Sequence, residues 1–140
     1  MRITVKSLPK PKVKKTKGER EFTLIGDYKF TLIVDGVNRS FTIRDGYEFD
    51  GKSAPKPVEA ITLGRIRWDD THYFEEVIVH DWLYDMGGLV LVNKDSWVEY
   101  KRKDADKIYR KIMKHMGRSW VRRWAEYLAV RIGGGFSWVG

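Results

Sequence analysis

The chain has 140 residues, 42% of them hydrophobic, which is enough for a single domain with a real core. It contains no cysteine, and this excludes disulfides and thiolate metal sites. No run of about 18 apolar residues occurs, so we expect no transmembrane segment, and the basic N-terminus lacks the apolar stretch of a secretion signal.

The net charge of +8 is unevenly distributed along the chain. Residues 1–20 hold eight basic and one acidic side chain, residues 21–100 hold eight and fifteen, and residues 101–140 hold eleven and three. The basic ends favour binding to nucleic acid, acidic lipid or another polyanion, and the acidic middle favours binding to a cation. Alternatively, the charges serve solubility alone. Residues 1–20 and 101–123 are candidates for non-specific nucleic-acid contacts. The second range lacks interleaved exposed aromatics, so it does not predict sequence-specific recognition.

The N-terminal half is typical of a small antiparallel sheet. Residues 1–20, rich in lysine and with two prolines, are predicted to be a basic arm or an extended edge segment. Residues 21–34 and 37–44 alternate in polarity as strands do, and the Asp-Gly pair between them indicates a hairpin turn. A third strand is expected to begin at residues 47–49.

The C-terminal half has the spacing of helices. The pattern predicts helices at about 70–86, 103–116 and 118–131, each ended by glycine, with a short hairpin at 89–100. We therefore predict an α+β fold in a single domain over residues 21–140: a small antiparallel sheet followed by three helices, the first two forming a helical hairpin. The third helix is expected to bury Trp120, Val121, Trp124, Tyr127 and Leu128 and to expose Arg122, Arg123 and Glu126.

The run VIVHDWLY at residues 77–84 holds the strongest candidates for chemistry. His80 and Asp81 point about 100° apart on a helix, so one can transfer a proton while the other binds a cation. Tyr84 lies four residues after His80 and shares its face. On the second helix, Asp106 borders the apolar face, where a carboxylate needs a partner, and two antiparallel helices would bring it to the His80 ring.

Two interpretations of this pair stay open. In the first, Asp106 orients the imidazole of His80, whose other nitrogen takes a proton from water, while Asp81 holds a cation. Loop oxygens around Asp50 would complete that cation site, and Ser53, in the same proline-broken loop, is a further candidate. In the second interpretation, the pair is a satisfied polar contact that only holds the helices together.

The pattern HDxxY, then AD at the start of a helix, resembles the phospholipase A2 motif, and the match is closest to the disulfide-free viral and short bacterial forms. It covers about residues 75–116. The resemblance implies a calcium-dependent esterase acting on phospholipid. It also implies that His80 is the general base, Asp81 the calcium ligand, and Tyr84 and Asp106 the partners that orient the histidine.

The expected calcium site departs from that family. Phospholipases A2 carry a glycine-rich calcium loop shortly before the histidine, whereas residues 64–79 here hold one glycine. The loop around Asp50 is the alternative source of oxygen ligands, so any calcium is expected between Asp50 and Asp81.

Four blocks of sequence are similar to a family of small tailed-phage and prophage proteins of unassigned function. They are YEFDGKSAP (47–55), HDWLY (80–84), ADKIYRKIM (105–113) and YLAVRIGG (127–134), in that order. This resemblance implies a phage origin, with the host cytoplasm or the virion as the place of action. Two functions remain open: a phage-encoded phospholipase A2-like hydrolase, or a non-catalytic virion or accessory protein whose basic ends bind a polyanionic partner.

Overall fold

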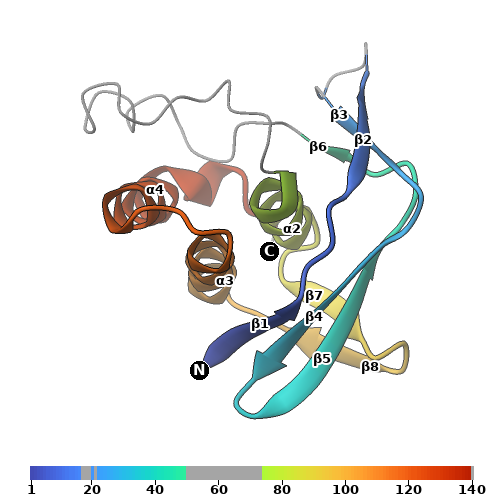
Figure 1. Cartoon of the computed structure of the whole chain (residues 1–140), viewed down its shortest axis with the longest axis horizontal. Helices are drawn as coiled ribbons and strands as arrows, with labels where there is room; N and C mark the ends of the chain where they lie inside the picture. The colour runs from blue at the N-terminus through green and yellow to red at the C-terminus, as the bar shows by residue number, and fades with distance from the viewer. Residues whose placement is uncertain (17–19, 21, 50–73, 140) are drawn as a thin grey trace.

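The structure is a computed structural model that describes residues 1–16, 20, 22–49 and 74–139 (Figure 1). Antiparallel strands occupy the N-terminal half and three α-helices follow, so the predicted α+β class is confirmed. In chain order the elements are β1 (Ile3–Ser7), β2 (Lys12–Lys15), β3 (Phe22–Ile25), β4 (Tyr28–Val34), β5 (Val37–Ile43), β6 (Glu48–Phe49), α2 (Phe74–Asp85), β7 (Leu89–Val92), β8 (Ser96–Glu99), α3 (Arg102–His115), α4 (Trp120–Gly133) and the 3-10 turn η1 (Gly134–Phe136).

The main sheet has the strand order β1-β4-β5 and is antiparallel throughout. β4 and β5 form the predicted hairpin, and both Asp35 and Gly36 at its tip have positive φ, as a type I′ turn requires. Phe30 pairs with Phe41 across the hairpin, and both side chains are buried. Strand alternation therefore turns one face of this hairpin toward the core.

The basic N-terminal segment contributes edge strands. β1 pairs with β4, and β2 pairs with β3 in a second sheet of order β2-β3-β6. The lysines of β2 are exposed, while Val13 packs against the core. Residues 3–7 and 12–15 thus lie along the edges of the two sheets, where charged side chains discourage further strand pairing.

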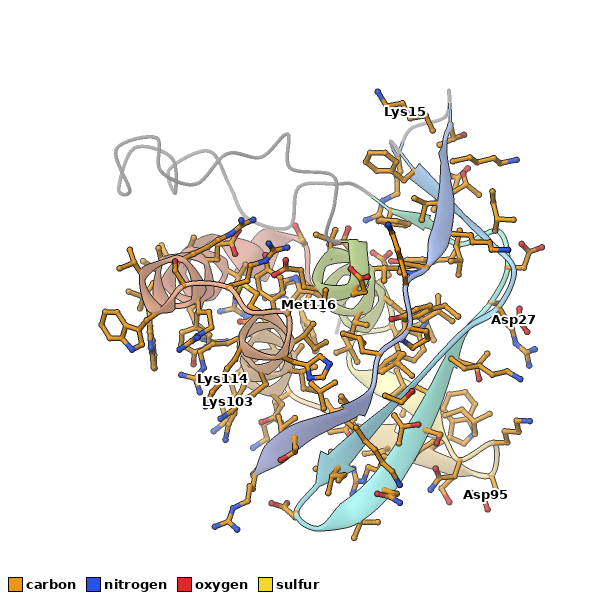
Figure 2. All side chains as sticks on the ribbon, in the orientation of Figure 1. Lys15, Asp27, Asp95, Lys103, Lys114 and Met116 are labelled. Carbon is orange, nitrogen blue, oxygen red and sulfur yellow. The ribbon has the colours of Figure 1, made fainter. Side chains whose placement is uncertain are left out.

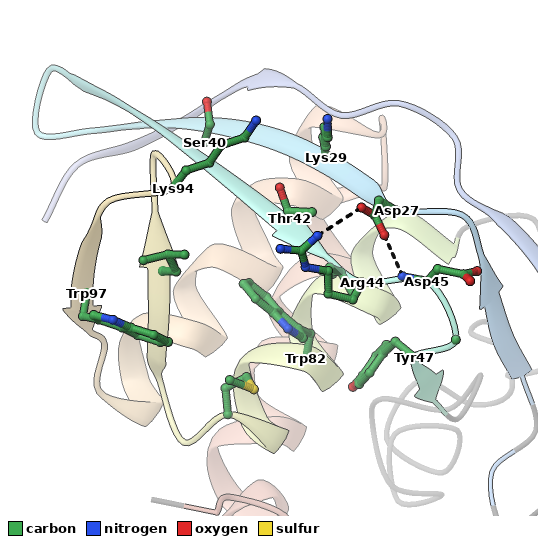
Figure 3. A pocket seen from close by; sticks show the side chains of 14 residues that line it. Asp27, Lys29, Ser40, Thr42, Arg44, Asp45, Tyr47, Trp82, Lys94 and Trp97 are labelled. Atoms are coloured by element: carbon green, nitrogen blue, oxygen red, sulfur yellow. Dashed lines mark hydrogen bonds and ion pairs between the residues drawn. The ribbon is translucent and has the colours of Figure 1, made fainter.

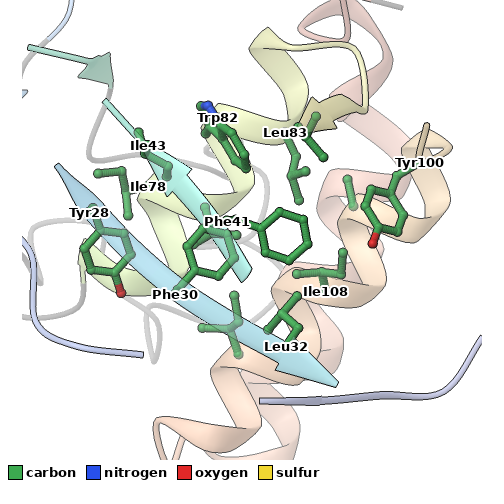
Figure 4. Packing of buried hydrophobic residues seen from close by; sticks show 14 of the residues in the cluster. Tyr28, Phe30, Leu32, Phe41, Ile43, Ile78, Trp82, Leu83, Tyr100 and Ile108 are labelled. Atoms are coloured by element: carbon green, nitrogen blue, oxygen red, sulfur yellow. The ribbon is translucent and has the colours of Figure 1, made fainter. Parts of the chain in front are cut away.

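The core lies between the β4–β5 hairpin and the helices α2 and α3 (Figure 4). The rings of Phe30 and Phe41 stack with centroids 4.9 Å apart, and Trp82 of α2 meets both edge-on. Ile108 of α3 and Leu83 of α2 are buried in the same cluster. Helix α2 packs on α3, and α3 packs on α4, so the first two helices lie side by side as predicted.

The connection between α2 and α3 is the expected hairpin. β7 pairs antiparallel with β8, and the turn residues Asn93 and Lys94 have positive φ. Within the described ranges, no helix has the length and apolarity that crossing a bilayer requires.

The prediction for the faces of the third helix is wrong. In α4, Glu126, Ala129 and Val130 are buried, whereas the apolar residues Trp120, Val121 and Leu128 are exposed. The inward face of α4 consists of Glu126 and the small apolar residues Ala129 and Val130, and Glu126 pairs with Arg122 within the same helix. Trp120 lies on the outer face of α4, but one exposed aromatic near the end of the 101–123 range is not the interleaved set that sequence-specific recognition would need.

Candidate functional site

His80 and Asp106 meet in the interior between α2 and α3. His80 Nε2 lies 2.8 Å from Asp106 Oδ1, and the two side chains are 2% and 0% exposed. Packing of one helix against another creates this contact, with both residues on facing sides. The structure therefore brings together the two side chains that the sequence places on neighbouring helices.

Asp106 receives donors at both carboxylate oxygens. Tyr84 Oη donates to Oδ1 at 2.5 Å, and Arg131 Nη1 donates to Oδ2 at 2.9 Å. Arg102, one turn before Asp106 on α3, lies 3.9 Å from Oδ2. A buried carboxylate is tolerated when its lone pairs are satisfied in this way.

Electrostatics favour a neutral imidazole beside an ionised carboxylate. Burial lowers the pKa of the His80 imidazole, and the hydrogen bond to Asp106 opposes this without reversing it. Burial acts to raise the pKa of the Asp106 carboxyl, but hydrogen bonds from His80 and Tyr84 outweigh it and hold that pKa below its usual range. At neutral pH, Nε2 therefore carries the proton donated to Asp106, and Nδ1 is the basic nitrogen.

The free nitrogen of His80 is the unusual atom of the site. Nδ1 is buried and has no hydrogen-bond partner among the described residues. The imidazole lies between the rings of Tyr84 and Tyr109, with centroid distances of 4.3 and 4.5 Å. A buried polar atom without a partner costs about 1–3 kcal/mol, and this cost favours a small polar partner such as water or substrate at Nδ1.

Sequence reasoning missed what α4 adds to the site. Arg131, in the last turn of α4, donates to Asp106. The guanidinium of Arg102 on α3 donates to the backbone carbonyls of Val130 and Arg131 in that turn, each at 3.0 Å. Gly134 follows directly, and a Cβ at that position would lie 2.6 Å from Tyr84 Oη. The signal for this contact in the sequence is the glycine run 133–135, which by itself predicts only the end of a helix.

The proposed calcium ligands are not brought together by the described residues. Asp81 Oδ2 lies 3.7 Å from Arg20 Nη2, and the same guanidinium donates to Asp85 at 2.5 Å. Asp50 and Ser53 lie outside the described residues. Within the part of the chain that the structure describes, no three histidine, aspartate or glutamate side chains form a group able to hold a metal ion.

A second set of buried charges lies one turn from His80. Glu76 accepts from Arg118 Nε and Nη2 at 2.8 and 2.5 Å. Glu126 on α4 lies 3.6 Å from Arg122, and burial, with repulsion from Glu76, raises the pKa of the Glu126 carboxyl to about 7. Glu126 therefore lies on the buried face of α4 as part of this set, beside the apolar residues Ala129 and Val130.

A cavity of about 760 Å³ lies on the other side of the molecule, between the outer face of β4–β5, the end of α2 and the β7–β8 hairpin (Figure 3). Trp82 and the more exposed Trp97 line it together with Arg44, which lies 3.4 Å from Asp27. None of its lining residues belongs to the His80–Asp106 pair. This cavity is therefore separate from the candidate site.

Comparison with known proteins places the chain in a family without assigning an activity. No curated protein and no solved structure matches it. A family model does match residues 23–130, which is most of the chain and includes His80, Tyr84 and Asp106. The expectation that the chain belongs to a family of unassigned function is confirmed. The chain belongs to the family described as protein of unknown function (DUF1353).

Proposed function

We propose that the protein is a phospholipase A2-like hydrolase in which His80 and Asp106 activate a water molecule. The observation that supports this most is the hydrogen bonding at Asp106 Oδ1. Oδ1 accepts hydrogen bonds from both His80 Nε2 and Tyr84 Oη. The imidazole is therefore held at Nε2, and Nδ1 is available to accept a proton. The resemblance to phospholipase A2 assigns the same roles to the same three residues.

The chemistry follows from the protonation state. Nδ1 of a neutral His80 accepts a proton from water, and the hydroxide formed attacks an ester carbonyl. The resulting imidazolium is stabilised by the Asp106 carboxylate, which stays ionised because Tyr84 and Arg131 also donate to it. The proton on Nδ1 is then available for the leaving alkoxide, which restores the neutral imidazole.

Calcium is a separate part of the proposal. Asp81 would be the ligand on α2 and Asp50 the ligand from the loop before it, and the ion would polarise the ester carbonyl. A cation at Asp81 has to compete with Arg20, which lies 3.7 Å from the carboxylate. The described side chains thus do not by themselves form a calcium site, and the proton transfer described above requires none.

The alternative is a non-catalytic phage virion or accessory protein. The deep burial of His80 favours it, because a polar pair that only joins α2 to α3 needs no access to solvent. In that case the basic ends of the chain would bind a polyanionic partner, and the origin of the protein in a phage is common to both proposals.

Fatty-acid release from mixed phospholipid vesicles tests the proposal. Wild type, His80→Asn and the control His115→Ala would be compared, with calcium and with a chelator; His115 is the exposed histidine at the end of α3. We expect release that is lost in His80→Asn and kept in His115→Ala. Release that persists in the chelator would remove Asp81 and Asp50 as essential ligands. No release by wild type across lipids and metals, with a folded but destabilised His80→Asn, would favour the structural alternative.

A further inference from the structure

The outer face of α4 carries an apolar stripe that nothing covers among the described residues. Trp120, Val121, Leu128 and Ile132 are exposed by 66, 51, 54 and 82%. Trp124, half-buried, lies between them on the same face. Single exposed apolar side chains are ordinary, but four on one helix face, with Trp124 between them, mark a binding surface. These five residues are called the α4 stripe below.

A basic face on α3 lies next to the α4 stripe. The guanidinium of Arg110 lies over the rings of Trp124 and Tyr127, at 4.3 and 4.9 Å from their centroids, and so joins the two surfaces. Figure 2 shows Lys103 and Lys114 on the same side of α3. The α3 basic face consists of Lys103, Lys107, Arg110, Lys111 and Lys114, all exposed or half-exposed.

The basic side chains are close enough to repel one another. The pKa of Lys111 is lowered, first by its partial burial and then by repulsion from neighbouring cations, among them Arg110, Lys114 and Arg123. Such a cluster produces a strong local positive potential. Its natural complement is a surface with closely spaced negative charges.

We propose that the α4 stripe and the α3 basic face together dock the protein on an anionic lipid surface. Tryptophan and aliphatic side chains on one helix face insert at the boundary between headgroups and acyl chains, while flanking lysines contact anionic headgroups. A second copy of the chain is a poorer occupant because each copy has a net charge of +8 and would bring its basic face against the other.

The docking helix also leads into the candidate site. Arg131, in the last turn of α4, donates to Asp106, and Gly134 directly after the helix lies against Tyr84. Docking through α4 would therefore hold the His80–Asp106 pair at a defined distance from the bilayer. The inference rests on the proposed function for its purpose, but lipid binding itself requires neither His80 nor hydrolysis.

Co-sedimentation of the full chain with phosphatidylcholine vesicles, with and without phosphatidylglycerol, tests the proposal. We expect binding that requires phosphatidylglycerol and weakens with salt. The double variant Leu128→Ser/Ile132→Ser should bind roughly tenfold or more weakly, because two inserted aliphatic side chains are lost. The matched control Val37→Ser removes an apolar side chain that is 56% exposed on β5 and should bind as wild type does. Circular dichroism checks that each variant is folded.

Several outcomes would overturn the docking proposal. The double variant could bind vesicles as tightly as wild type, or wild type could show no preference for phosphatidylglycerol. The protein could bind an oligonucleotide more tightly than vesicles, with no change in the double variant. It could also form a dimer that the double variant abolishes. Failure of the proposed function is distinguishable. Wild type that binds vesicles but releases no fatty acid rejects hydrolysis alone, whereas release from dispersed short-chain phospholipid without vesicle binding rejects docking alone. Binding retained in His80→Asn while release is lost supports both.

Discussion

Asp106 organises the interior around it. Its carboxylate is fully buried, yet it accepts hydrogen bonds from His80 and Tyr84 on α2 and from Arg131 on α4. Because Asp106 itself belongs to α3, one side chain connects all three helices. A buried charge with donors from several elements gains its stability only when all of them are in place.

Removal of the Asp106 carboxylate should therefore destabilise the protein strongly. Asp106→Ala leaves Arg131 without its anionic partner and Tyr84 and His80 without an acceptor. We expect the free energy of unfolding to fall by about 3–5 kcal/mol, as for other broken buried pairs. Guanidinium chloride unfolding measures this, with the exposed turn residue Asp95→Ala as the control, for which a change within about 0.5 kcal/mol is expected. Equal stability of the two variants would contradict the assigned role.

Glu126 should make stability depend on pH. Its folded pKa of about 7 lies above the ordinary value of 4.5, so the folded protein keeps a proton that the unfolded chain releases between these values. Stability from this group is therefore present below about pH 4.5 and is lost as the pH rises through about 7, by on the order of 3 kcal/mol.

Glu126→Gln tests this dependence, because the amide cannot ionise. Unfolding experiments should give similar stability for both proteins at about pH 4 and a more stable variant at about pH 8. His80, whose pKa is lowered in the folded protein, costs stability in the opposite direction, as the pH falls below its ordinary 6.5. The variant leaves His80 in place, so the difference between the two curves isolates Glu126. A variant less stable than wild type at about pH 8 would disprove the assignment.

Among the elements, α4 departs most from its sequence pattern. The spacing of its apolar residues correctly indicates an amphipathic helix, but a pattern identifies a face and not the neighbour that the face meets. Here α4 buries Glu126 together with the small apolar residues Ala129 and Val130, which share a buried cluster with Tyr109 and Met113 of α3. The apolar side remains outside, where it forms the α4 stripe.

Two truncations to alanine compare the exposed face of α4 with the buried core. Leu128→Ala on the exposed face should change the free energy of unfolding by no more than about 0.5 kcal/mol. Ile108→Ala on the buried face of α3 should cost about 2–5 kcal/mol, because it opens a cavity in the core. A large loss in Leu128→Ala would mean that the stripe is covered within the chain itself.

The junction of α4 with η1 depends on the absence of a side chain at one position. A Cβ at Gly134 would meet Tyr84 Oη at 2.6 Å, and Tyr84 is held by its bond to Asp106. Gly134→Ala should therefore cost about 1–3 kcal/mol of stability through overpacking. Gly135→Ala is the matched control, since nothing lies within 4 Å of its Cβ position. Thermal unfolding of both variants measures the difference. Equal unfolding midpoints would show that Tyr84 moves aside without loss of stability.

At the scale of the whole molecule, the start of the basic N-terminal segment lies next to the basic helix α3. β1 contacts α3 (Figure 1). The Nζ of Lys107 donates to the backbone carbonyl of Met1. The charge counts along the chain show two basic ends but not this contact. Folding therefore places Met1 and Lys107, which are 106 positions apart in the chain, on neighbouring parts of the surface.

The sequence by itself determined the α+β class, the β4–β5 and β7–β8 hairpins, the helices and the meeting of His80 with Asp106. These features depend on local signals: alternation, helical spacing, Asp-Gly turns and a carboxylate on an apolar face that needs a partner. Only the tertiary structure decided that Arg131 and Gly134 complete the site, and that α4 buries Glu126 while Trp120 and Leu128 stay exposed. Such contacts join residues far apart in the chain, and which of two possible faces is buried depends on the chemistry of the neighbour, which no single helix encodes.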